Sequence, residues 1–197
     1  MDNKSYALGL GIAQNLLGMG IKKADLNVED FAKAVKDAFA GKPEMDYRQA
    51  QIIASNYIDE LDRKMTDARI KANEQYLEEN KKIDGVVTLP SGLQYRIINP
   101  GDPDSRHAAP TDTVSCHYEG WLLDGTLFDS SLQRGMPAEF GVNQVIPGWT
   151  EALQLMNVGA KWHLVIPSEL AYGAQGAGGV IPPHSALIFD VELLKIL

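Results

Sequence analysis

The most reactive side chains of this sequence do not stand in catalytic spacings. Cys116 and His117 are neighbours on a predicted strand, so their side chains leave opposite faces and cannot form a thiolate–imidazole pair. A small buried residue is the simpler interpretation of Cys116. The histidines are His107, His117, His163 and His184. Their spacing is not that of metal ligands, and neither a His-Glu-x-x-His nor a paired Cys-x-x-Cys motif occurs, so we expect no metal and no cofactor.

A glycine-rich stretch from Gly173 to Gly179 could be taken for a phosphate-binding loop. It leads into Val180-Ile181-Pro182-Pro183 and not into the start of a helix. Without a helix start the backbone amides are not presented to a phosphate. We interpret the stretch as a mobile loop.

The stretch Gln144–Leu153 contains residues suited to the wall and floor of an apolar pocket. Two β-branched residues, Val145 and Ile146, precede a Pro-Gly break, and Trp149 then opens a short helical pattern. A large flat ring at the first turn of a buried helix can form the floor of an apolar pocket, and Val145 and Ile146 can form a wall. For these residues alone, a core tryptophan beside an ordinary turn is the preferred interpretation, so the rest of the sequence must decide between the two.

The elements that would position such a pocket are mostly strands. Strand composition is found at residues 93–98, 114–122, 162–166 and 186–197. Asp124-Gly125 is a tight hairpin signal. From these features we predict an α+β domain over residues 84–197, in which an antiparallel β-sheet wraps around one short helix.

The N-terminal part differs in composition from the C-terminal part, and its residue pattern predicts only helices. We expect an all-helical dimerisation domain at 1–45 and a long stalk helix at 46–83, on the order of 55 Å long. Asn27 is the predicted N-cap of the second helix, and Gly41 its stop. In the stalk, apolar residues recur at spacings of three and four only as far as Met65, so the polar segment 69–82 is expected to stand largely in solvent.

Three helices of this kind can bury little surface by themselves. We therefore predict a homodimer through residues 1–65. The alternative is that the helices fold back on the C-terminal domain. Removal of residues 1–83 is expected to leave a monomer that acts on short substrates but serves large protein substrates poorly.

Composition excludes several classes of partner. Of the 197 residues, 45% are hydrophobic and 22% charged, which is typical of a globular protein. The net charge of −8, without a basic cluster, argues against nucleic acid. No apolar stretch is long enough to span a membrane, and no signal peptide opens the sequence. We expect a cytoplasmic protein with no membrane partner, or a periplasmic one if a signal peptide has been removed.

The motifs of the C-terminal part occur in a characteristic order. They are His117-Tyr118-Glu119-Gly120, Asp124-Gly125 to Ser131, Val145-Ile146-Pro147-Gly148-Trp149, Ala171-Tyr172-Gly173, and Ile181-Pro182-Pro183-His184 to Leu193. With these motifs, residues 86–197 resemble an FKBP-type peptidyl-prolyl cis-trans isomerase. The helical part resembles the dimeric bacterial branch of the family, of the macrophage-infectivity-potentiator kind, with Thr88–Tyr95 at the junction.

The resemblance implies an enzyme that turns Xaa-Pro bonds in unfolded or partly folded proteins, and it implies the pocket residues. The catalytic group would be Tyr118, Phe128, Asp129, Trp149, Tyr172 and Phe189, and the substrate-binding group Arg134, Phe140, Val145, Ile146 and Ile181. The Tyr172 hydroxyl and the Ile146 amide would bind carbonyl groups of substrates or of macrolide inhibitors of the tacrolimus or rapamycin type. Ala138 and Ala177 replace an aromatic wall residue and a loop histidine of the eukaryotic pattern, which would leave the rim more open.

This activity suits a site without a nucleophile. The barrier to rotation of the amide, about 18–20 kcal/mol, comes from resonance, and no covalent bond needs to break. Asp129 would take a direct part or would accept a structural hydrogen bond from Tyr118 or Arg134. A module that binds apolar segments without catalysis is the alternative function.

Overall fold

Residues 2–197 are described by a computed structural model in which two units separate between Asp67 and Ala68. The first unit contains α1 (Asn3–Gly18), η1 (Lys23–Asp25), α2 (Val28–Phe39) and the first part of α3 (Tyr47–Asn80). As predicted, Asn27 caps α2: its side-chain oxygen accepts a hydrogen bond from the Asp30 amide at 3.1 Å. Gly41 follows α2 with a φ of 68°, a conformation that glycine adopts without strain.

The helices of the first unit leave many of their apolar residues exposed. Over their full ranges neither α1 nor α2 contains a buried residue. Leu8 is 72% exposed, Phe39 91% and Tyr47 65%. Large apolar patches left exposed on a monomeric protein often mark interaction sites.

The second part of α3, from Ala68 to Asn80, belongs to the second unit. Asn73 and Asn80 are buried. Asn80 Nδ2 donates to Gln94 Oε1 at 2.8 Å, and Gln94 Nε2 donates to the Leu77 carbonyl at 2.9 Å. Most residues of the segment 69–82 are exposed, as expected, but the face that carries Asn73 and Asn80 is packed against the rest of the second unit, which the sequence did not predict. Polar side chains can be buried at low cost when their donors and acceptors are paired.

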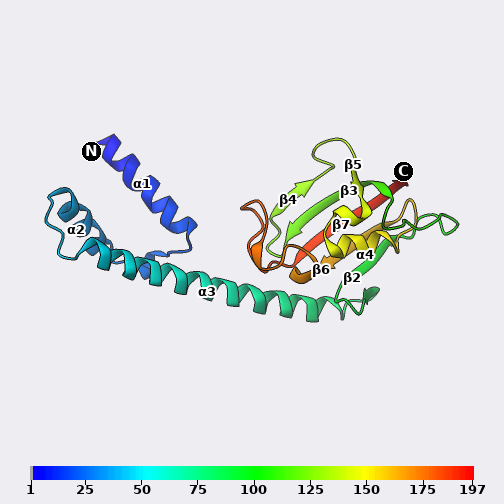
Figure 1. Ribbon diagram of the computed structural model, residues 1–197, viewed down its shortest axis with the longest axis horizontal. Coiled ribbons are helices and arrows are strands. Elements are labelled where there is room, and N and C mark those ends of the chain that lie inside the picture. Colours follow the sequence, from blue (N-terminus) through cyan, green and yellow to red (C-terminus); the bar gives the residue numbers. More distant parts are fainter. Residues whose placement is uncertain (1) are drawn as a thin grey trace. The chain divides into compact units, whose positions relative to one another are not determined.

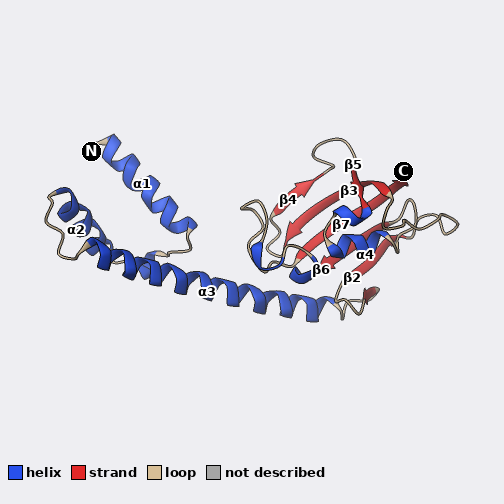
Figure 2. Cartoon of the chain, in the orientation of Figure 1, coloured by secondary structure: helices blue, strands red, loops and turns tan. Residues whose placement is uncertain are grey.

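The second unit is built on an antiparallel sheet, which confirms the predicted fold class (Figures 1 and 2). Its strands are β1 (Val86–Thr88), β2 (Gln94–Asn99), β3 (Thr113–Leu122), β4 (Leu127–Ser130), β5 (Ala138–Gly141), β6 (Lys161–Ile166) and β7 (Leu187–Ile196). The order is β1-β2-β6-β7-β3-β4, and β5 also pairs with β3. The predicted hairpin joins β3 to β4, with Gly125 at a φ of 84° and the Thr126 amide bonded to Asp124 Oδ1 at 2.9 Å.

The short helix α4 (Pro147–Leu153) lies on one face of this sheet, as Figure 1 shows. It can approach closely because Gly148 has no side chain: a Cβ there would lie 2.6 Å from Ile166 Cγ2. Trp149, Ala152 and Leu153 are buried against the sheet. The short helices η2 (Val142–Gln144), η3 (Ser168–Leu170) and η4 (Gly173–Gln175) complete the unit.

Cys116 is fully buried on β3, where burial raises the pKa of its thiol to about 12. This agrees with the prediction of a small buried residue. Between residues 2 and 197, the helices include none with the length and apolar character needed to cross a bilayer.

Candidate active site

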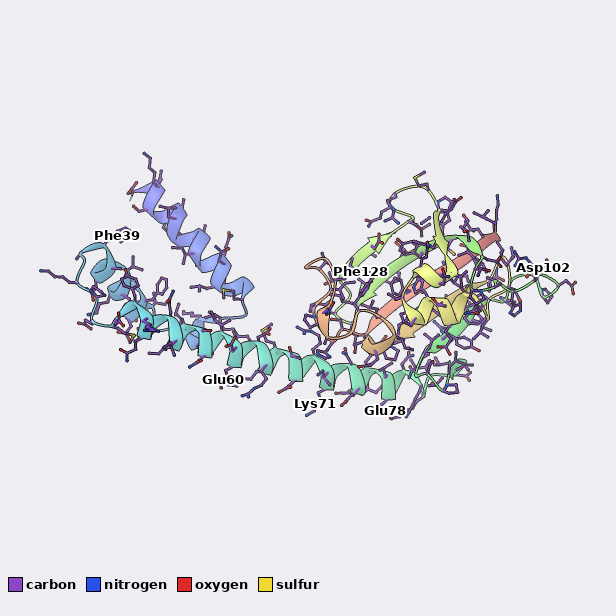
Figure 3. All side chains as sticks on the ribbon, in the orientation of Figure 1. Phe39, Glu60, Lys71, Glu78, Asp102 and Phe128 are labelled. Atoms are coloured by element: carbon purple, nitrogen blue, oxygen red, sulfur yellow. The ribbon has the colours of Figure 1, made fainter. Side chains whose placement is uncertain are left out.

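A cavity of about 420 Å³ opens between α4 and the strands β3, β4, β5 and β7. Its lining residues are Tyr118, Phe128, Asp129, Phe140, Gln144, Val145, Ile146, Trp149, Tyr172 and Phe189. All of them except Gln144 are residues that the sequence nominates. Phe128, which Figure 3 labels, comes from β4.

The strand register brings the aromatic rings together across Gly120. This glycine on β3 pairs with Asp129 of β4 on one side and with Phe189 of β7 on the other. A Cβ at Gly120 would lie 2.6 Å from the ring of Phe189 and 2.7 Å from that of Phe128. The missing side chain therefore makes room for these two rings, which meet edge to face with centroids 5.5 Å apart.

Trp149 lines the cavity from α4. Its indole is 4% exposed and meets the rings of Tyr118, Phe140 and Phe189 at steep angles, with centroid distances of 5.1, 5.6 and 5.3 Å. Such edge-to-face contacts hold the indole plane in one orientation. The buried Nε1–H has no hydrogen-bond acceptor among residues 2–197.

Asp129 is the one charged residue in the lining and is tied to two neighbours. The Tyr118 hydroxyl donates to its Oδ2 at 2.5 Å, and Arg134 bonds to its Oδ1. Arg134 Nη2 also donates to the Tyr118 hydroxyl at 2.8 Å, and the guanidinium lies over the Tyr118 ring. Burial acts most strongly and opposes the charge, but the hydrogen bonds from Tyr118 and Arg134 overcome it and lower the pKa of Asp129.

Tyr172 stands at the rim, 41% exposed. Partial burial, with a smaller effect of the Asp129 charge, raises the pKa of its hydroxyl. The hydroxyl is therefore protonated at neutral pH and can donate a hydrogen bond to a carbonyl group. Ile146 immediately precedes α4, and its own carbonyl accepts from the amides of Trp149 and Thr150.

The cavity lining differs from the predicted set of site residues at three positions. Arg134 does not line the cavity and acts on it through Asp129 and Tyr118. Ile181 is 7% exposed and packs with the core, outside the lining. Gln144 lines the cavity although the sequence did not nominate it. Its position directly before Val145 is the one signal that could have found it.

An antiparallel sheet that carries one helix and an aromatic cavity is the arrangement implied for an FKBP-type isomerase. Residues 104–194 match the family model of the FKBP-type peptidyl-prolyl cis-trans isomerase. Residues 1–97 match the model of the domain amino terminal to FKBP-type peptidyl-prolyl isomerase.

Similar proteins extend this match over nearly the whole chain. The FKBP-type 22 kDa peptidyl-prolyl cis-trans isomerase of Escherichia coli is 48% identical over 98% of this chain and 94% of its own length. The outer membrane protein MIP of Legionella longbeachae is 38% identical over 99% and 85%. The crystal structure of FkpA from Escherichia coli superposes with a TM-score of 0.78 at 35% identity, covering 98% of this chain and 94% of that one.

The chain therefore belongs to the FKBP-type peptidyl-prolyl cis-trans isomerases, in a form with a helical N-terminal domain. This membership confirms the predicted enzyme class over the alternative of a module that binds without catalysis.

Proposed function

We propose that the cavity receives the prolyl ring of a protein substrate, with Trp149 as the floor and Tyr118, Phe128, Phe140 and Phe189 as the walls. Val145 and Ile146 complete the apolar surface. The observation that carries this assignment is the convergence of aromatic rings from separate elements around one cavity whose single charge is neutralised by Arg134.

Such a cavity can favour the twisted amide over the planar one. The planar resonance form carries more charge on its carbonyl oxygen, so transfer from water into apolar surroundings costs the planar form more. Each ~1.4 kcal/mol of this preference accelerates rotation about tenfold. In the proposed site, the Tyr172 hydroxyl and the Ile146 amide hold substrate carbonyls, and Asp129 orients Tyr118.

The test is a peptide assay with two variants. NMR exchange or protease-coupled kinetics on a short Xaa-Pro peptide measures kcat/KM for the wild type, Tyr172→Phe and Gln133→Ala. Gln133 is exposed and lies outside the cavity lining, so it serves as the control. A loss of about twofold to tenfold in Tyr172→Phe, as expected for one hydrogen bond, supports the assignment. Equal rates for wild type and Tyr172→Phe would remove Tyr172 from the substrate contacts.

Assembly is the second part of the proposal. We propose a dimerisation domain at 1–45, a stalk helix at 46–83 and an isomerase domain at 84–197, with a homodimer formed through residues 1–65. Support comes from the uncovered apolar residues of α1, α2 and the first part of α3. In such a dimer two isomerase domains can hold one large unfolded or partly folded client, which raises avidity without new contacts.

Sedimentation velocity tests the dimer. Leu8→Glu places a charge on an α1 residue that is 72% exposed, and we expect it to shift the protein to the monomer. Gln14→Glu on the same helix makes the same charge change at a polar position and is the control. A Leu8→Glu variant that stays dimeric would place the interface elsewhere.

Inhibitors and cellular location are further proposals. Macrolides of the tacrolimus or rapamycin type are proposed inhibitors, with fewer contacts at the rim because Ala138 and Ala177 have small side chains, and an inhibition assay measures their affinity. The cytoplasmic location stays a proposal, and the name of the Legionella relative points to the cell envelope as the alternative. Fractionation of cells that express the full-length gene separates the two.

A further inference from the structure

The loop from Tyr172 to Ser185 is bonded to two side chains of α3. Arg69 Nη1 donates to the Pro183 carbonyl at 2.8 Å, and Asn73 Nδ2 donates to the His184 carbonyl at 2.5 Å. Asn73 is 8% exposed, so its amide is withdrawn from water and depends on this partner. All these residues lie in the second unit.

His184, whose carbonyl accepts the hydrogen bond from Asn73, has a strained backbone conformation. Its φ of 55° is the only left-handed value of a residue other than glycine within the described chain. A side chain at such a φ persists when surrounding contacts determine it, and such residues gather at functional sites. The Asn73 amide is one of these contacts. The other is the His184 amide itself, which donates to the Gly173 carbonyl at 2.7 Å.

Gly173 directly follows Tyr172, which lines the cavity. A chain of contacts therefore runs from Asn73 through the His184 backbone to Gly173 and Tyr172. The far end of the same loop is closed by the Ala177 amide, which donates to the Ile181 carbonyl at 2.9 Å, and by Ser185 Oγ, which donates to the Pro182 carbonyl at 2.8 Å. The loop has its own internal contacts, and α3 supplies the external ones.

We propose that Asn73, assisted by Arg69, is a positioning residue of the isomerase site. It fixes His184 in its left-handed conformation and thereby holds Tyr172 at the rim of the cavity. The stalk helix then contributes to the chemistry of the domain as well as to its placement. This inference rests on the proposed contact between Tyr172 and the substrate.

The first measurement is hydrogen exchange of the His184 amide in the full-length protein, followed by NMR. We expect Asn73→Ala to exchange faster at His184 than the wild type, by about twofold to tenfold if one hydrogen bond is lost. Gln75→Ala is the matched control, because Gln75 is an exposed amide on the same helix that bonds only to Glu79 Oε1. Unchanged exchange at His184 in Asn73→Ala would overturn the proposal.

The second measurement is a double-mutant cycle in kcat/KM on an Xaa-Pro peptide, far below the melting temperature of every variant. Asn73→Ala alone should lose about twofold to tenfold, and the same substitution in a Tyr172→Phe background should lose much less, because the group that it positions is already gone. Additive losses, or an Asn73→Ala rate equal to that of Gln75→Ala, would overturn the proposal. A residue that only stabilises the fold would lower the melting temperature and leave this coupling at zero.

The Arg69 contact offers a rescue. Arg69→Ala should reproduce part of the Asn73→Ala effect, and Arg69→Lys should restore it, because an ammonium can still donate to the Pro183 carbonyl. Tyr172→Phe alone tests the proposed function: full activity of this variant would show that the substrate contact of Tyr172 is wrong, whereas the exchange of the His184 amide in Asn73→Ala tests the anchoring of the loop by α3 independently of activity.

Discussion

The Tyr118 hydroxyl on β3 donates to Asp129 Oδ2 on β4 at 2.5 Å, and Arg134 binds the other oxygen of the same carboxylate. The carboxylate is thus held in one orientation at the edge of an aromatic cavity, and its charge is balanced within the site. We expect Asp129→Asn to lower kcat/KM about threefold to tenfold, equivalent to roughly 0.7–1.4 kcal/mol of transition-state stabilisation. Glu139→Gln, an exposed position on β5 with the same loss of charge, is the control. Equal rates in the two variants would contradict the assignment.

The pH dependence of stability follows from the same contacts. The pKa of folded Asp129 is lowered from its ordinary value. A lowered folded pKa stabilises the protein above the unfolded pKa of about 3.9, and this contribution is lost as the pH falls through the folded value. The melting temperatures of wild type and Asp129→Asn should therefore differ by a constant amount from pH 8 to about pH 5, and the difference should shrink below about pH 4. A difference that grows toward acid pH would reverse the sign and refute the interpretation.

Substitutions at two buried tryptophans can separate an effect on stability from an effect on activity. Trp149 and Trp162 are each 4% exposed, but Trp162 stacks on Tyr95 at a centroid distance of 4.2 Å, outside the cavity lining. Replacement of either by Phe should destabilise the fold by about 0.5–3 kcal/mol, because both substitutions leave unfilled volume in the core. Only Trp149→Phe should also lower kcat/KM at a temperature where both variants are folded. Urea unfolding and the peptide assay measure the two effects, and a comparable loss of activity in Trp162→Phe would show that Trp149 has no special part.

Gly120→Ala tests the packing of the cavity walls. The new methyl group would lie 2.6–2.7 Å from the rings of Phe128 and Phe189, so both rings must move. Overpacking of this kind costs about 1–3 kcal/mol, and displaced walls should lower kcat/KM as well. Chemical shifts of the two rings would report the movement. Wild-type shifts together with wild-type activity would show that the rings tolerate the methyl group.

Two fragments test the role of the second part of α3. Residues 68–197 retain the hydrogen bonds from Arg69, Asn73 and Asn80, and residues 84–197 lose them. At about 0.5–1.5 kcal/mol for each of these three hydrogen bonds, the shorter fragment should be less stable by roughly 1.5–4.5 kcal/mol. Thermal unfolding measures the difference. Both fragments should be monomers in sedimentation velocity, and equal melting temperatures would mean that the contacts contribute nothing.

Local patterns predicted most of the fold because the sequence signal for each helix, strand or turn lies within a few consecutive residues. Strand alternation, the Asp124-Gly125 hairpin and the cap at Asn27 all act within their own segments. The pocket residues came from the family motifs, and most of them meet in one cavity. What could not be predicted was the pairing of polar side chains far apart in the sequence. In the sequence, Asn73 cannot be told apart from the solvated residues of a charged helix. Only the structure shows the His184 carbonyl beside it.

Cys116, on β3, is the only cysteine of the chain. Its side chain is fully buried, and burial raises the pKa of its thiol to about 12. Alkylating reagents and oxidants attack the thiolate, which is scarce at such a pKa and here is sealed off from solvent. The folded protein thus behaves toward maleimide reagents as though it had no cysteine. A single cysteine engineered at any exposed position should take up a spin label or fluorophore alone, without prior removal of the native one.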